Sequence, residues 1–445
     1  MAEGLVRRLS LLQATAINMT DMVGIGPFIT LPLVISMMNG PYFLYAWLAG
    51  AILSLLDSMV WSELGAAFPK AGGSFNFLKE AYGQNGAGKL MSFLFVWQTM
   101  IQAPLVIASA AIAFAKYFSF LTPLSPLMAK SISGAVVVCI ILLLYRRIES
   151  IGKISLFMCA GVLITLLWII IGGLSHGNFM YPIRHINDGL TANYAFITLI
   201  GYASVNTVYS YLGYYNVCHL GGEIINPTRN IPKSMFISII CIAALYLLMN
   251  ISITSVIPWQ QAKSSEFVIS VFMRELFGSQ LARVATCLIL WVAFASVFSA
   301  TLGYSRIPYA AAEDGAFFTV FAKLHPTKNF PYVSLLTLGA VAFIFSLLFK
   351  LTDVIKAILA MRILIQFIGQ GIGLLLLRKR GKTNFPYKMP LFPLPVITAM
   401  GMWIFLLKST GSTLILLGFG IISLGLIAFF IKAKVNHEWP FKKSL

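Results

Sequence analysis

Long apolar stretches separated by short polar segments make up most of this chain. They lie near residues 12–38, 42–68, 90–118, 127–145, 154–174, 191–219, 233–257, 282–304, 331–349, 354–377, 390–408 and 411–432. An apolar run of roughly 20 residues is long enough to cross the hydrocarbon core of a bilayer as an α-helix. The pattern therefore predicts an all-α polytopic membrane protein with twelve transmembrane helices.

The composition strengthens this prediction and excludes an ordinary soluble protein. Of the 445 residues, 59% are hydrophobic and 10% are charged. Soluble domains average roughly 45–50% apolar and about 25% charged residues. The five cysteines all lie in apolar stretches and form no CxxC pair, which indicates core packing and neither a metal site nor disulfides.

The net charge of +18 indicates how the helices are oriented. In a soluble protein such an excess would suggest nucleic-acid binding, but no basic tract here is long. Roughly two-thirds of the 32 lysines and arginines fall on the N-terminal side of the predicted spans, as expected of cytoplasmic loops. We therefore expect a multi-pass protein of the cytoplasmic membrane, with both termini in the cytoplasm, the lipid bilayer around it and no nucleic-acid partner.

Two of the predicted spans are interrupted near their centres. The first contains GIGP at 24–27, and the sixth contains SYLG at 210–213. The sixth span is five spans after the first, so two five-span repeats would have opposite orientations in the membrane. Paired broken helices in inverted repeats are typical of secondary transporters, where they form a binding site near the bilayer midplane. Two ordinary glycine packing sites are the alternative.

Three polar strings between the spans carry a resemblance to known transporters. WSELGAAFPKAGGSF at 61–75 follows the second span, EIINPTRNIPK at 223–233 follows the sixth, and SRIPYAAAEDG at 305–315 follows the eighth. In this order and in these loops they resemble the amino acid–polyamine–organocation (APC) superfamily of permeases. The resemblance covers essentially the whole chain, and the sixth span is most similar to L-type and related amino acid permeases.

The resemblance implies the leucine-transporter fold, a 5+5 inverted repeat with broken helices 1 and 6. Residues 1–185 would form the first repeat, 186–382 the second, and 383–445 spans 11 and 12 with a cytoplasmic tail. The expected function is secondary active transport of neutral amino acids across the cytoplasmic membrane by alternating access. A polyamine or cationic amino acid permease and a non-transporting solute sensor stay open as alternatives. We expect that the protein is not an enzyme, because the sequence lacks the cluster of polar residues that a membrane enzyme needs near an interface.

The two breaks would bind both charges of a zwitterion through backbone groups, so that no charged side chain is needed. Unpaired carbonyls near Met22 and Val23 attract an ammonium group, and unpaired amides near Ile25 and Gly26 attract a carboxylate. By resemblance, Tyr209 and Tyr211 would be gate and wall of the pocket; packing between helices is the alternative. The expected substrate-binding residues are Met22, Val23, Gly24, Ile25, Gly26, Gln102, Tyr209, Ser210, Tyr211, Gly213 and Phe298.

The coupling ion is less well defined by the sequence. Asp21 lies one turn before Gly24, where it either binds a proton or hydrogen-bonds the break. By resemblance, Gly161 replaces a lysine that many family members carry in the fifth span. The hydroxyl pair of sodium-coupled relatives is also incomplete, because Ser296 and Ser299 are three residues apart. We therefore expect no cofactor, and coupling to protons in preference to sodium.

Two further ionisable residues, Asp57 and Arg362, fall within predicted spans. Such residues are expensive in a membrane and usually functional. Arg362 would gate the pathway or pair with Asp57 or Asp21, and the sequence does not decide between these roles. It also leaves open the substrate, symport against exchange, and the oligomeric state.

Overall fold

The computed structural model is all-helical over the residues that it describes, which are 5–84, 86–350, 358, 361–435, 437 and 439–441. This part of the chain contains no strand, and its isolated β-bridges join Leu9 to Ile224 and Ala71 to Leu220. Within it, seven helices are long and apolar enough to cross a membrane, or eight if one bent pair counts as a single span. A polytopic helical membrane fold is thus confirmed, whereas the twelve-span 5+5 layout stays a prediction.

The first five predicted spans each contain helix. The first is a pair bent by 42°, and short helices lie between the others. The elements are α1 (Leu11–Met22), α2 (Gly26–Met38), η1 (Pro41–Phe43), α3 (Leu44–Ala67), α4 (Ser74–Tyr82), α5 (Ala87–Phe118), α6 (Pro126–Leu144), α7 (Ile148–His176) and α8 (Met180–Arg184).

The remaining predicted spans also contain helix, and the sixth is again broken. Residues 354–357 and 359–360 of the tenth span lie outside the described residues. The elements are α9 (Tyr194–Tyr211), α10 (Asn216–His219), η2 (Gly221–Glu223), α11 (Pro227–Thr254), α12 (Trp259–Ala262), α13 (Val268–Tyr304), α14 (Arg306–Glu313), η3 (Thr319–Ala322), α15 (Tyr332–Leu348), η4 (Ile363–Ile368), α17 (Gly369–Arg380), α18 (Leu394–Ser409) and α19 (Ser412–Val435).

Local sequence signals set several of these helix starts. Ser10 and Gln13 form a capping box before α1, in which each side chain accepts a hydrogen bond from the backbone N–H of the other residue. Ser125 caps α6, and Pro126 follows as the first helical residue, where its missing N–H is not needed. These signals start the helices next to the polar segments that separate the apolar stretches.

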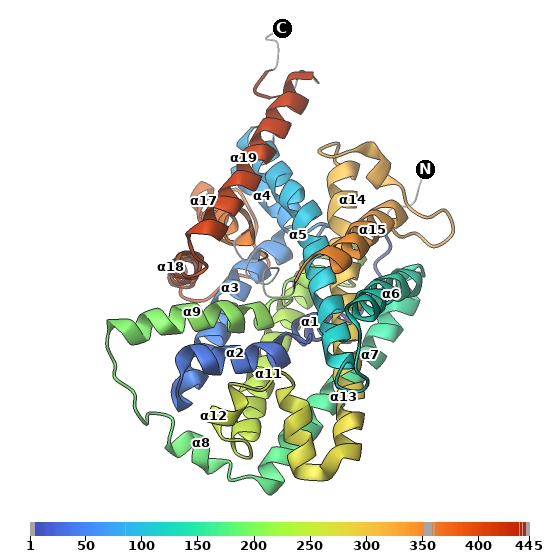
Figure 1. Ribbon diagram of the computed structural model, residues 1–445. Coiled ribbons are helices and arrows are strands. Elements are labelled where there is room, and N and C mark those ends of the chain that lie inside the picture. The colour runs from blue at the N-terminus through green and yellow to red at the C-terminus, as the bar shows by residue number, and fades with distance from the viewer. Residues whose placement is uncertain are drawn as a thin grey trace.

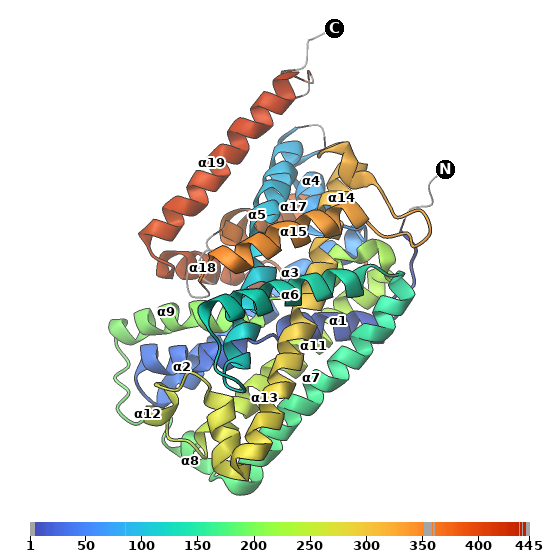
Figure 2. The same cartoon turned by 45° about the vertical axis from the view of Figure 1, so that its right-hand side comes forward.

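The two broken spans lie inside the bundle. Helix α1 packs against α7, α11 and α13, while α2 packs against α9 (Figure 1). Helix α3 packs against both α9 and α11. At the periphery, α19 runs along the outside of the other helices and contacts α5 and α18 (Figure 2). The packing therefore surrounds both breaks with neighbouring helices.

The three polar strings that carry the family resemblance come together on one face of the bundle. Glu223 of the second string forms a bidentate ion pair with Arg306 of the third, with both N–O distances at 2.9 Å. The N–H of Gly72 in the first string donates to the His219 carbonyl at 3.0 Å. Preceding α1, Leu9 pairs through its backbone with Glu223 and Ile225, so the N-terminal segment joins the same assembly.

A second ion pair, in which only the carboxylate is fully buried, connects this face to the C-terminal helices. Glu63 of the first string binds Arg378 of α17 at 2.5 Å and accepts the N–H of Met389 at 2.8 Å. The Arg378 guanidinium also lies over the rings of Phe385 and Phe392. These contacts give Glu63 a structural role, because they join α3 to α17 and to the segment before α18.

Glu223→Gln tests the stabilising role of the pair with Arg306. Both side chains are almost fully buried, at 0% and 2% exposed, so the change leaves an arginine without its counter-charge. Removing one partner of a buried pair typically destabilises a protein by about 3–5 kcal/mol. We expect a loss of that size in the free energy of unfolding, measured by denaturant titration in detergent micelles.

Glu149→Gln is the matched control for that change. Glu149 faces Arg8 at 3.6 Å, but the two side chains are 50% and 60% exposed. Exposed pairs contribute roughly 0–1 kcal/mol. If Glu223→Gln and Glu149→Gln lowered the free energy of unfolding equally, burial of the Glu223–Arg306 pair would not stabilise the fold.

Candidate functional site

The break between α1 and α2 leaves backbone amides without partners. Val23 leaves the helical conformation at φ −87° and ψ 74°, and the helix resumes at Gly26. The N–H groups of Gly24, Ile25 and Gly26 donate no hydrogen bond to any described residue. Such amides at a helix start attract anions.

The break after α9 lies directly against the first one. Helix α9 ends at Tyr211, and Gly213 takes a φ of +120°, which side-chain-bearing residues rarely adopt. A Cβ atom at Gly213 would lie 2.8 Å from the carbonyl carbon of Asp21 and from the nitrogen of Met22. Glycine is therefore required here both by conformation and by the close approach of the two chains.

Tyr246 of α11 connects the two helix ends. Its buried hydroxyl lies 2.8 Å from the Met22 carbonyl oxygen and 3.2 Å from that of Ser210, so one proton is shared between the last turns of α1 and α9. We expected these carbonyls to face a substrate ammonium group, but in this conformation they already accept a hydrogen bond. The sequence offered no signal for Tyr246 beyond a tyrosine in an apolar span.

Helix α13 holds the broken helices through a second polar network. Thr20 and Ser299 share a hydrogen bond at 2.5 Å, and the Asn216 amide donates to the Ser299 carbonyl at 2.7 Å. In the same short helix, α10, the N–H of Val217 donates to the Asn18 side chain at 2.9 Å. Ser299, expected as a coupling residue, thus takes part in helix packing in this conformation.

A small cavity of about 50 Å³ lies where the two breaks meet. One ordered water needs roughly 10–15 Å³ of such space, so the cavity suits a solute of a few heavy atoms. Nine of the residues expected to bind the substrate or the coupling ion line it: Asp21, Met22, Gly24, Ile25, Gly26, Tyr209, Ser210, Gly213 and Ser296. Eight of these nine residues come from the two interrupted spans, and Ser296 comes from α13.

Five other predicted residues lie off the cavity lining: Val23, Gln102, Tyr211, Phe298 and Ser299. Val23 and Phe298 are fully buried among hydrophobic neighbours. Tyr211 packs on Trp47 and Tyr246, at ring-centroid distances of 6.1 and 5.2 Å. Gln102 is buried close to Tyr304. In this conformation the packing alternative thus describes Tyr211 and Phe298, whereas Tyr209 lies at the cavity.

Arg362 brings a positive charge to the cavity wall. It lies just before η4, is 3% exposed, and donates to the hydroxyls of Tyr215 and Tyr304, the latter at 2.6 Å. Its guanidinium carbon is 5.0 and 5.2 Å from the centroids of these two rings. Its Nε has no acceptor among the described residues. The sequence singled out Arg362 but missed both tyrosines, because nothing in their local pattern distinguishes them from packing aromatics.

The structure separates the two acidic residues that the sequence offered as partners of Arg362. Asp57 accepts hydrogen bonds from the Tyr214 hydroxyl at 2.5 Å and from the Trp403 indole at 3.1 Å. Asp21 lies on the cavity wall, close enough to Arg362 for electrostatic attraction. The described contacts of Arg362 therefore favour the neighbourhood of Asp21 over that of Asp57.

Trp291 explains why glycine occupies position 161. A Cβ atom on Gly161 of α7 would overlap the Trp291 indole nitrogen from α13. That nitrogen donates to the Met158 carbonyl at 3.2 Å, which holds the ring in place. The space that a side chain would need at position 161 is thus filled by an aromatic ring.

Comparison with known proteins identifies relatives along nearly the whole chain. The family model described as amino acid permease matches residues 9–441. The serine/threonine exchanger SteT of Bacillus subtilis is 26% identical over 417 residues, which cover 92% of each chain. The human cystine/glutamate transporter is 25% identical over 397 residues, covering 87% of this chain and 77% of its own.

A third relative shows how widely the named substrates vary. The mouse cationic amino acid transporter 4 is 26% identical over 386 residues, which cover 80% of this chain and 57% of the relative. The names of these three relatives thus refer to hydroxyl-bearing, acidic and cationic amino acids, although their sequence identities to this chain are similar. The local geometry of this chain must therefore carry any argument about its own substrate.

Substitutions at Gly26 test whether this cavity binds the solute. A Cβ atom there would meet Tyr209 and Ser210 at 3.4 and 3.5 Å, which is ordinary contact, so Gly26→Ala should fold and bind. The two further methyl groups of Gly26→Val overfill the site, and overpacking costs about 1–3 kcal/mol, or roughly 5- to 150-fold in affinity. Binding is measured by solute-induced stabilisation of the purified protein. Wild-type affinity in a folded Gly26→Val protein would place the binding site elsewhere.

Proposed function

The chain belongs to the amino acid permease family of the APC superfamily, and from this premise we propose that it is a secondary active transporter of neutral amino acids. It would work by alternating access in the cytoplasmic membrane, with both termini in the cytoplasm. The observation that carries the proposal is the small cavity at which both helix breaks meet, with three unpaired amides beside it. These amides suit the carboxylate of an α-amino acid, the group that all such substrates share.

The charges around the cavity favour a substrate without net charge. Asp21 and Arg362 contribute one carboxyl and one guanidinium, so the wall carries no excess of either sign when both are ionised. A zwitterion keeps that balance, whereas a polyamine or cationic amino acid would add positive charge near a buried guanidinium. Unpaired charge is costly in a low-dielectric interior. The cationic alternative is therefore disfavoured.

Contacts between helices support the proposed inverted repeat. Helix α3 packs on α11, α5 on α13, and α6 on α15, which pairs the second, third and fourth predicted spans with the seventh, eighth and ninth. Each pair is five spans apart, so equivalent spans of the two proposed repeats lie beside each other. We therefore propose the division into 1–185, 186–382 and 383–445, with the binding site between the first two parts.

A panel of small solutes tests the substrate class. In proteoliposomes, serine and alanine should compete for uptake, whereas ethanolamine, which lacks the carboxylate, should bind on the order of 10²-fold or more weakly, because it leaves buried donors unpaired. Putrescine is the cationic competitor in the panel, and glutamate is the acidic one. Strongest competition by putrescine would establish the cationic alternative. Binding without movement of any solute would establish the sensor.

Proton coupling through Asp21 is the second part of the proposal. Asp21 is the acidic residue on the described cavity wall, so a proton taken up there would be bound next to the substrate. Asp21→Asn mimics the protonated form. We expect this variant to retain binding and exchange but to lose accumulation driven by a pH gradient, measured as isotope uptake in proteoliposomes at equal sodium on both sides.

Asp57→Asn is the matched control, because Asp57 is also buried but lies off the cavity. Its folded fraction should still accumulate substrate in response to the pH gradient. Accumulation that survives in Asp21→Asn would eliminate Asp21 as the coupling group. Uptake that requires sodium would instead favour a site near Thr20, Val23 and Ser299.

A further inference from the structure

An open cavity of about 590 Å³ lies at the corner where α6 ends and α7 begins, beside the loop that leads into α15 (Figure 2). Leu142, Arg146, Arg147 and Ser150 line it from the corner, and Lys328 lines it from the loop. None of these residues belongs to the cavity at the helix breaks. The corner cavity is therefore separate from the proposed substrate site.

The lining of the corner cavity contains three cations and no acidic residue. Arg146 and Arg147 are exposed, and neither side chain pairs with an acid in the described part of the chain. Glu149 follows them closely in sequence, but it faces Arg8 at 3.6 Å. The two arginines therefore leave an uncompensated positive charge in the cavity.

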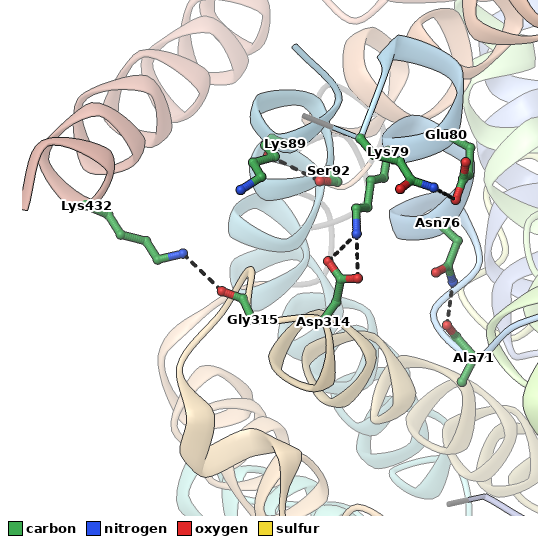
Figure 3. Close-up of polar contacts among 10 residues, drawn as sticks. Ala71, Asn76, Lys79, Glu80, Lys89, Ser92, Asp314, Gly315 and Lys432 are labelled. Carbon is green, nitrogen blue, oxygen red and sulfur yellow. Dashed lines mark hydrogen bonds and ion pairs between the residues drawn. The ribbon is translucent and has the colours of Figure 1, made fainter. Parts of the chain in front are cut away.

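A lysine on another part of the same protein shows the contrast. Lys79 of α4 donates to both carboxylate oxygens of Asp314, at 2.5 and 2.7 Å, so these two charges offset each other (Figure 3). No such acid lies within the lining of the corner cavity. Its cations are thus available to an anion from outside the protein.

The third cation and the start of α7 add further donors for an anion. Lys328 donates to the Tyr145 carbonyl at 2.9 Å, and its ammonium lies 4.7 Å from the centroid of the Tyr145 ring. An ammonium has three N–H donors, so Lys328 can bind an anion while keeping this bond. Helix α7 begins without a side-chain cap, and the N–H groups of Ile148 and Glu149 donate to no described residue. The positive end of the helix dipole therefore adds to the charge of the three side chains.

The exposed apolar faces of α6 and α7 both end at the corner cavity. Leu142 lines the cavity and is 66% exposed, and Val138 is exposed one turn before it on α6. On α7, Phe157 and Ile164 are exposed on the same helix face as Ser150, roughly two and four turns beyond it. Side chains of this kind on a membrane helix face lipid. The cations thus lie where the lipid-facing surface of both helices ends.

We propose that the corner cavity binds the headgroup of an anionic phospholipid. The lipid phosphate would lie between Arg146, Arg147 and Lys328, and its acyl chains would follow the exposed faces of α6 and α7. Arginine suits this role, because its planar guanidinium can bind two phosphate oxygens at once. A soluble phosphate would use the same cations but would gain nothing from the apolar surface next to them.

Native mass spectrometry of the purified full-length protein tests the proposal. The probes are phosphatidylglycerol and phosphatidylcholine with identical chains, added at increasing concentration in detergent. Wild-type protein should retain phosphatidylglycerol in preference to phosphatidylcholine, and equal retention of the two lipids would overturn the proposal. Arg146→Gln and Arg147→Gln should each weaken phosphatidylglycerol binding roughly fivefold, as expected for about 1 kcal/mol per arginine near a membrane surface.

Arg229→Gln is the matched control, since Arg229 is an exposed arginine at the start of α11 that does not line the corner cavity. An equal loss in this variant would show diffuse surface attraction and overturn the site. Displacement of the lipid by inorganic phosphate at comparable concentrations would show a soluble-anion site and overturn the lipid assignment. Each variant is first checked for monodispersity and thermal unfolding, and if one of the two cavity variants fails to fold, the other decides.

Discussion

Each helix break removes backbone hydrogen bonds inside a bundle that excludes water, and the neighbouring side chains are arranged around that deficit. An unpaired backbone group in such surroundings costs several kcal/mol. The Tyr246 hydroxyl donates to the carbonyls of Met22 and Ser210, and the Asn18 side chain accepts a hydrogen bond from the N–H of Val217. The amides of residues 24–26 have no such partner in the described part of the chain. A ligand carboxylate would accept hydrogen bonds from these amides. The same unpaired groups would then affect both the stability of the fold and the recognition of a substrate.

The face that carries the N-terminal segment is held together by contacts between segments far apart in the sequence. The Glu223–Arg306 pair, the Lys79–Asp314 pair and two β-bridges join the segments around α1, α3, α9 and α14. The three strings that resemble permease signatures are thus largely occupied in holding this face together. In the described conformation these strings connect distant segments, while the cavity lies at the breaks.

Apolar periodicity predicted where helices lie, and the two interruptions predicted the residues around the breaks, because both depend on residues close together in the chain. Tyr209 and Ser296, which also line the cavity, were expected only from the family resemblance. The tyrosine assignments show where this reasoning ends. Residues two apart on a helix point roughly 200° away from each other, so Tyr209 lines the cavity while Tyr211 packs on Trp47. The partners of Arg362 were not predictable either, since Tyr215 and Tyr304 reach it only after distant spans pack together.

The contact between Gly161 and Trp291 constrains how this protein can diverge from its relatives. A side chain gained at position 161 meets the indole, and a smaller residue at 291 leaves an empty space beside the glycine. Either single change therefore passes through an overpacked or a cavity-containing intermediate. The two positions are therefore epistatic: a side chain at position 161 destabilises the protein less in a background where residue 291 has already become small, so the residue on α13 constrains which residues α7 can acquire.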